Sequence, residues 1–280
     1  YTFALTWSVG NTTSMSERSD FHRWCLRHVP NFVLPLQCHV HDVYVDWSCE
    51  PQYLRPWSAD MQTVPRLDLS AFDTVKIPTT LTVTYGFLGA MLNLKRRHVI
   101  LDGCKGCGKS LIADNILQHL WNDRQWPVLS LHFSRNIKMR HVQDVIEQCH
   151  ERRPYGFTAP PGKQVFIHID DVNMPVPDAY GTQCSLEVLR QLIDREGFFD
   201  RQRWLFRCVM DTVLLLTPSP AAASDETVPR RLHRHCTALM VPPPSIEGAA
   251  SIFTPVLRQF LGFARPDGTA FSRTVVQLHE

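Results

Sequence analysis

The stretch His98-Val-Ile-Leu-Asp-Gly103-Cys-Lys-Gly-Cys-Gly108-Lys109-Ser110 decides the fold of this 280-residue chain. It fits the pattern G-x-x-x-x-G-K-[ST] and lies where that pattern must lie, after a β-rich run and before a helical one. The glycines let the backbone curl so that its N–H groups point at phosphate oxygens, and the positive end of the following helix adds to that attraction. The stretch therefore predicts a P-loop that binds a nucleoside triphosphate.

The residues of this loop have separate expected tasks. The nucleotide-binding set is Gly103, Cys104, Lys105, Gly106, Cys107, Gly108, Lys109 and Ser110. We expect Lys109 to contact the β- and γ-phosphates and Ser110 to ligate Mg²⁺. Cys104-x-x-Cys107 also has a spacing found at zinc and redox sites, but no second paired-cysteine motif follows. We therefore interpret the two cysteines as part of the loop.

A carboxylate must complete the metal site, and Gln164-Val-Phe-Ile-His-Ile-Asp170-Asp171 supplies one. A mostly apolar run that ends in two acids is typical of a central parallel strand whose carboxyl end opens into the ligand crevice. We expect Asp170 to hold Mg²⁺, through water, and Asp171 to polarise the attacking water. A solvated turn after the strand is the alternative interpretation, and it suits Asp171 better than Asp170.

Composition adds bounds but names no partner. The 29 basic and 27 acidic residues give a formal charge of +2, spread along the chain, so neither nucleic acid nor a membrane is indicated. Apolar runs stay far below the roughly 20 residues of a membrane helix. Nine cysteines at irregular spacings, with no signal peptide, favour reduced thiols in a soluble intracellular protein.

Short β-rich runs alternate with helical ones from His98 onward, which predicts an α/β fold with a parallel sheet and helices on both faces. The predicted strands are His98–Leu101, Val128–Phe133, Val165–Ile169, Val213–Leu216 and Thr237–Val241. The predicted helices are Asp20–His28, Thr82–Leu94, Lys109–Trp121, Val142–His150 and Leu186–Arg195.

We expect three parts: a lead-in segment at 1–95, a nucleotide-binding core at 96–244 and the start of a helical lid at 245–280. The chain does not begin with Met, and a new helix begins near Ser245 without closing another core, so we expect a fragment of a longer protein. His39-x-His41 and His233-x-His235-Cys236 lack complementary clusters, and we interpret them as ordinary surface or core residues rather than metal ligands.

The stretch Ile169-Asp-Asp-Val-Asn-Met-Pro-Val-Pro-Asp-Ala-Tyr180 resembles the third AAA+ module of dynein heavy chains, particularly axonemal ones. Further blocks match in order: Trp7-Ser-Val-Gly10, Ile77-Pro-Thr79, Phe133-Ser134, Gln143-Asp-Val-Ile146, Gly156-Phe-Thr-Ala-Pro-Pro-Gly-Lys163, Gly181-Thr-Gln and Leu189-Arg-Gln-Leu-Ile-Asp194. The resemblance covers nearly the whole chain, and the Asp-Asp-x-Asn-Met-Pro stretch is much more specific than the P-loop.

The resemblance implies a P-loop NTPase of AAA+ type with a helical lid only partly present. It implies one of six modules joined in a ring within one heavy chain, in a microtubule motor of cilia or flagella, with ATP or ADP and Mg²⁺ as cofactors. The implied partners are the neighbouring AAA+ modules and, through the full-length motor, intermediate and light chains and microtubules. The implied location is the cytoplasm, the cytoskeleton and the axoneme. The third module is similar to a regulatory site.

The family also places an arginine of one module against its neighbour's nucleotide, where it stabilises charge on the transferring phosphate. Pro229-Arg230-Arg231-Leu-His-Arg234-His235 resembles that stretch with an extra or shifted residue, so the finger is Arg230 or Arg234. A solvated basic helix end is the alternative.

Three departures from the family pattern bear on turnover. Thr217-Pro-Ser-Pro-Ala-Ala-Ala-Ser224 replaces glycines and a basic residue, which leaves Thr217 without an expected sensor role. Leu81 and Thr84 replace an acid and a base in the lead-in, and Asp171 stands where many AAA+ proteins have Glu. Three functions stay open: a regulatory ATPase, a non-hydrolysing structural module and, less favoured, a stand-alone P-loop kinase or nucleotidase.

Overall fold

The computed structural model divides the chain into two compact units, Gly86–Val241 and the combination of Tyr1–Tyr85 with Pro242–Glu280. The structure describes residues 2–13, 15–29, 34–35, 38–46, 53–60, 76–201, 203–219 and 228–260. None of the helices in these ranges is long and apolar enough to cross a membrane.

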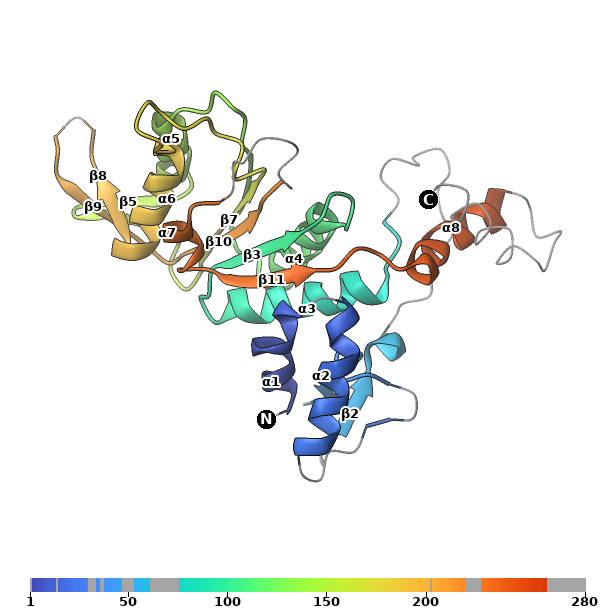
Figure 1. Cartoon of the computed structure of the whole chain (residues 1–280). Helices are drawn as coiled ribbons and strands as arrows, with labels where there is room; N and C mark the ends of the chain where they lie inside the picture. Colours follow the sequence, from blue (N-terminus) through green and yellow to red (C-terminus); the bar gives the residue numbers. More distant parts are fainter. Residues whose placement is uncertain are drawn as a thin grey trace. The chain divides into compact units, whose positions relative to one another are not determined.

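A five-stranded parallel sheet forms the centre of the Gly86–Val241 unit (Figure 1). Its order is β11-β3-β10-β7-β4, with bounds β3 Val99–Gly103, β4 Val128–His132, β7 Val165–Asp170, β10 Thr212–Thr217 and β11 Thr237–Val241. Every predicted strand is confirmed to within two residues at each end. The predicted α/β fold, a parallel sheet flanked by helices, is confirmed.

Four helices of this unit follow the strands. They are α4 Lys109–Arg124, α5 Met139–Gln148, α6 Cys184–Arg195 and the short α7 Arg230–His233, while α3 Thr80–Leu94 crosses the boundary between the units. Ile167 and Ile169 of β7 belong to the core cluster with α5 and α6 residues. Because successive strand side chains point to opposite faces, His168 and Asp170 face the other side, where α4 packs.

A second sheet was not predicted from the sequence. It has the order β5-β6-β9-β8, with bounds β5 Glu151–Arg153, β6 Gly156–Thr158, β8 Gly197–Phe199 and β9 Phe206–Met210. Three of these strands have only three residues, and β5 is fully exposed and charged. Such strands carry neither an apolar run nor a clear alternation, so only pairing with distant partners reveals them.

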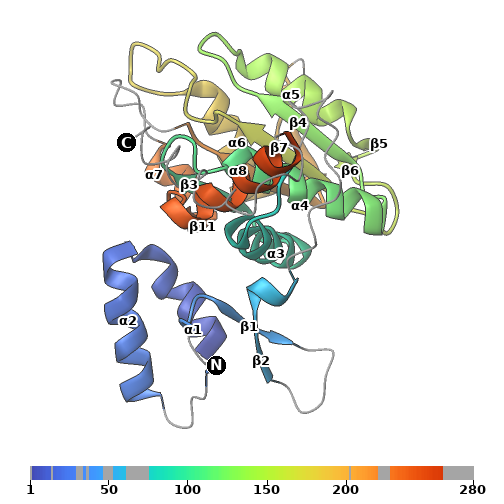
Figure 2. The same ribbon diagram turned by 90° about the vertical axis from the view of Figure 1, so that its right-hand side faces the viewer.

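The other unit combines short helices with the two-stranded sheet β1-β2 (Figure 2). Its elements are α1 Thr2–Ser8, η1 Gly10–Thr12, α2 Met15–His28, β1 Val43–Asp46, β2 Tyr53–Pro56, η2 Trp57–Asp60 and α8 Ile246–Phe260. Trp7 makes edge contacts with His41 and Tyr85, at ring-centroid distances of 5.6 and 5.7 Å. Residues 261–280 of the expected lid lie outside the described residues.

His98 should give the Gly86–Val241 unit a pH-dependent stability. Burial, with a smaller effect of His235, lowers the pKa of His98 to about 4 from 6.5. Its neutral Nδ1 accepts a hydrogen bond from the Leu214 N–H at 3.1 Å, which protonation would break. The unfolded chain binds more protons between these two pH values. The contribution of His98 to the free energy of unfolding should therefore be fully present above pH 6.5. It should fall by up to about 3 kcal/mol as the pH is lowered to 4.

Denaturant unfolding from pH 4 to 8 checks this expectation. His98→Asn offers an acceptor that does not titrate, so its stability should depend less on pH than that of the wild type. The matched control is His141→Asn, because His141 is exposed on α5. An unchanged pH dependence in His98→Asn would refute the assignment.

Candidate functional site

The loop between β3 and α4 has the backbone of a phosphate cradle. Gly106 and Gly108 have φ values of 77° and 89°, in the left-handed region that favours glycine. Gly103, with φ 155°, lies so close to β11 that a Cβ atom there would be 2.4 Å from the carbonyl oxygen of Val241. Glycine at these positions therefore follows from the path of the loop.

The first turn of α4 provides donors for an anion. The first N–H groups of a helix have no partner within it, and no side chain caps the start of α4. Cys104, Lys105, Gly106 and Ser110 are exposed. Free amides, the helix dipole and a solvent-accessible loop fit a phosphate chain.

Lys109 is held inside the loop rather than extended into solvent. Its Nζ donates to the carbonyl oxygens of Gly103 and Cys104 at 2.9 and 2.8 Å. Its side chain is nearly buried, with 9% of the residue exposed. The positive charge is thus fixed within the curl of the loop.

The two cysteines of the loop are joined by a hydrogen bond. The Cys107 Sγ donates to the Cys104 carbonyl at 3.0 Å, and burial raises the pKa of the Cys107 thiol. No cysteine in the described ranges forms a disulfide. Over those same ranges, no group of three or more His, Cys, Asp and Glu side chains could hold a metal ion.

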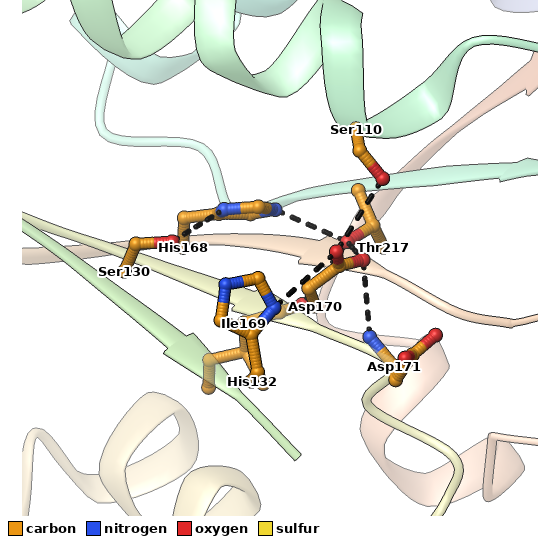
Figure 3. A network of polar contacts seen from close by, with 8 residues as sticks. All are labelled: Ser110, Ser130, His132, His168, Ile169, Asp170, Asp171 and Thr217. Atoms are coloured by element: carbon orange, nitrogen blue, oxygen red, sulfur yellow. Dashed lines mark hydrogen bonds and ion pairs between the residues drawn. The ribbon is translucent and has the colours of Figure 1, made fainter. Parts of the chain in front are cut away.

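The carboxylate of Asp170 is oriented by contacts at each oxygen (Figure 3). Its Oδ1 accepts from the Thr217 hydroxyl at 2.6 Å and from the Asp171 N–H at 3.1 Å. Its Oδ2 lies 3.4 Å from the Ser110 Oγ and 3.5 Å from the His132 Nδ1. Two donors therefore fix Oδ1, and Oδ2 faces the P-loop.

The Ser110 hydroxyl and Oδ2 of Asp170 fit Mg²⁺ rather than a metal that needs a full protein cage. Mg²⁺ takes oxygen ligands, keeps several waters and is usually bound by one or two carboxylates together with substrate phosphates. One hydroxyl and one carboxylate are the protein ligands such a site requires. The structure thus brings together Ser110, at the start of α4, and Asp170, at the end of β7, as the sequence predicts.

Comparison with known proteins agrees with this geometry. Residues 67–244 match the family model described as P-loop containing dynein motor region. The chain belongs to this dynein family. The chain is 28% identical over 281 residues to dynein axonemal heavy chain 6 of Homo sapiens, which covers 99% of this chain and 7% of that protein.

Two further relatives have similar values. Dynein axonemal heavy chain 17 of Mus musculus is 28% identical over 94% of this chain, and the ciliary dynein beta chain of Tripneustes gratilla is 28% identical over 93%. The alignments span 6% of each relative. The chain is thus a dynein AAA module that corresponds to a small part of these heavy chains.

In this dynein module, Asp171 has an unusual backbone. Its φ is 54°, in the left-handed region, and its N–H donates to Asp170. Among the described residues, its carboxylate has no hydrogen-bond or ion-pair partner. Asn173, two positions later, joins this segment to the loop after β10: its Nδ2 donates to the Ser219 carbonyl at 2.9 Å, and its Oδ1 accepts from the Ser219 N–H at 2.8 Å.

Arg230 and Arg234 are far from the P-loop of their own module. The first residue of β11 pairs with the main chain just before β3, through the Thr237 N–H and the His98 carbonyl. The P-loop follows the opposite end of β3, so the five residues of β11, about 15 Å, separate it from α7. Both arginines are exposed. The structure thus keeps them away from the P-loop of their own module.

Of four side chains around Asp170, sequence reasoning set one aside, Thr217, and missed the other three. Thr217 donates to it directly, His132 approaches it from β4, and His168 and Ser130 continue the polar contacts behind it. His132 lies on β4 and His168 on β7, two positions apart in the register of these strands. Nothing in the sequence around either histidine indicates that the two side chains lie near the same carboxylate. A polar residue inside the apolar run of β7 was the available signal.

The close approach at Gly103 predicts unequal costs for two alanine substitutions. Gly103→Ala should destabilise the dynein module by about 3 kcal/mol or more, because the new Cβ meets a main-chain oxygen. Gly106→Ala has open space and suffers only its positive φ, so about 1 kcal/mol is expected. Denaturant unfolding of both variants checks this, and equal costs would contradict it.

Proposed function

We propose that this chain is the regulatory, ATP-binding third module of an axonemal dynein heavy chain. In this role it binds ATP or ADP with Mg²⁺, and its nucleotide state influences the other modules of the ring. Its partners would be neighbouring AAA+ modules and, through the full-length motor, intermediate and light chains and microtubules. It would act in the axoneme of a cilium or flagellum.

The single observation that carries the proposal is the facing pair of Ser110 and Asp170 beside an uncapped α4. The hydroxyl and the carboxylate oxygen lie 3.4 Å apart, from elements distant in sequence, and the preceding residue, Lys109, directs its ammonium to the carbonyls of the loop. Phosphate donors and Mg²⁺ ligands are thereby adjacent, as a bound Mg²⁺–nucleotide requires. The relatives' names and the Asp-Asp-x-Asn-Met-Pro stretch support the choice of an axonemal heavy chain.

The mechanism assigns each described group one task. The α4 amides and Lys109 would bind the phosphates, and Ser110 and Asp170 would hold the metal, which supplies charge neutralisation at the β- and γ-phosphates. Asp171 would orient and polarise the attacking water, because its carboxylate has no competing partner within the described residues.

The proposed domain organisation is the one expected from the sequence: a lead-in segment at 1–95, a nucleotide-binding core at 96–244 and the start of a helical lid at 245–280.

A module that binds nucleotide without hydrolysis is the second candidate. Aspartate is one methylene shorter than glutamate, so the carboxylate of Asp171 reaches less far toward an attacking water. Its left-handed backbone, with φ 54°, further constrains where it can point. This geometry favours slow turnover or none.

Variants of the full-length heavy chain separate the two candidates. Lys109→Ala removes the charge in the loop and should weaken ATP binding at this site by about tenfold to a hundredfold. Asp171→Asn should leave binding within about twofold and lower phosphate release from this site by about a hundredfold or more. Nucleotide binding, phosphate release and motility are the measurements. If Asp171→Asn changes neither phosphate release nor motility while Lys109→Ala weakens binding as expected, hydrolysis at this site is excluded.

The arginine finger should act on a neighbouring module. Substituting the correct residue, Arg230→Ala or Arg234→Ala, should lower phosphate release from that neighbour by about a thousandfold and leave nucleotide affinity at this P-loop unchanged. Arg231→Ala, exposed between them, is the matched control. If neither substitution differs from the control, the basic stretch is only a solvated helix end.

A further inference from the structure

A histidine occupies the middle of the central strand β7, between two isoleucines that are fully buried. Only 2% of His168 is exposed, so each ring nitrogen needs a hydrogen-bond partner within the protein. Nδ1 lies 3.1 Å from the Ser130 Oγ on β4, and Nε2 lies 3.1 Å from the Thr217 Oγ1 on β10. The ring therefore bridges the two strands that flank β7 (Figure 3).

The directions of these hydrogen bonds follow from the single proton of the Thr217 hydroxyl. Its possible acceptors are the Asp170 Oδ1 at 2.6 Å, the Ile169 carbonyl at 3.3 Å and, in one tautomer of the ring, the His168 Nε2 at 3.1 Å. The shorter bond to the charged oxygen is the stronger one, so the proton points to Asp170. The Thr217 oxygen must then accept from His168, which places the ring proton on Nε2.

This tautomer leaves Nδ1 as an acceptor for the Ser130 hydroxyl. A chain of donors then runs from Ser130 through His168 and Thr217 to Asp170. With the proton on Nδ1 instead, Nε2 would compete for the Thr217 proton and Asp170 would lose a donor.

We propose that His168 is a positioning residue for the magnesium-side carboxylate, since its Nε2–H directs the Thr217 hydroxyl onto Oδ1 and thereby leaves Oδ2 facing Ser110. This inference rests on the proposed binding of Mg²⁺–nucleotide. The hydrogen-bonded path from His168 to Asp170 runs through Thr217, so His168 acts on the orientation of the carboxylate. Its loss should reduce the gain in nucleotide affinity that Mg²⁺ provides and spare the affinity without metal.

Two polar substitutions test the position of the donor. The amide nitrogen of Gln lies at about the distance of Nε2 along the side chain, whereas that of Asn lies at about the distance of Nδ1. His168→Gln should therefore keep the contact with Thr217, and His168→Asn should lose it. The two variants are similar in polarity, which separates donor placement from the general cost of changing a core residue.

The measurement is the affinity of the full-length protein for a ribose-labelled fluorescent ATP, with Mg²⁺ and with a chelator. The part of the fluorescence change that Lys109→Ala removes is assigned to binding at this P-loop. His168→Asn should reduce the ratio of the two affinities by about threefold to tenfold, the worth of one hydrogen bond. His168→Gln should restore the ratio to within about twofold of the wild type, and both should bind alike in chelator.

His150 offers a matched control at the other end of β10. It is also buried, its Nε2 lies 2.7 Å from the Thr212 Oγ1, and its Nδ1 lies 2.7 Å from the Ile146 carbonyl. Thr212 begins β10, whereas Thr217 ends it beside Asp170. His150→Asn should lower the melting temperature without changing the magnesium-dependent ratio.

Each outcome decides the proposal. A wild-type ratio in His168→Asn, an equal loss in His168→Gln, or the same loss in His150→Asn would overturn the positioning role and leave the proposed nucleotide site intact. A wild-type protein without any Lys109-dependent, magnesium-sensitive signal would overturn both. If His168→Asn does not fold, Ser130→Ala, on an exposed strand position, should reduce the ratio about twofold, and an unchanged ratio there would overturn the proposal.

Discussion

The hydrogen bonds that Asp170 accepts at Oδ1, from the Thr217 hydroxyl and the Asp171 N–H, are the constraint on which the proposed site depends. They turn the second oxygen toward Ser110, and the bond from Thr217 exists because β10 and β7 pair in parallel with Thr217 opposite Asp170. A slip of one residue would move the hydroxyl to the other face of the sheet. The register of two buried strands therefore sets the geometry of the metal side.

The phosphate side depends on a different constraint, the curl of the loop between β3 and α4. Gly103 lies against the main chain of β11, and Gly108 starts α4 in a left-handed conformation. Lys109 is held by loop carbonyls, so the positive charge is in place before a ligand arrives. Pre-organised donors of this kind reduce the ordering cost of binding. In the sheet, β10 lies between β3, which leads into the P-loop, and β7, which ends in Asp170. Helix α4 packs against all three strands.

Prediction from sequence was accurate where local pattern and chemistry coincide. The five strands of the central sheet and the pairing of the P-loop with Asp170 could be predicted, because apolar runs that end in Gly-Lys-Ser or Asp-Asp have few structural interpretations. The β5-β6-β9-β8 sheet could not, because its strands are short and partly charged and pair across distant segments. Thr217 was set aside because its loop departs from the family pattern. Its hydroxyl nevertheless reaches Asp170, because the register of β10 places the two residues opposite each other.

By itself, the sequence determined the α/β class, the P-loop, the acid of the proposed metal site and membership of the dynein family, since each depends on residues adjacent along the chain. Only the tertiary structure decided what surrounds Asp170. Ser130, His168 and Thr217 lie on three strands, and their contacts require the order β10-β7-β4 and a shared face toward α4. Side-chain direction and strand register are properties of the assembled sheet, so no single segment encodes the polar chain that orients the carboxylate.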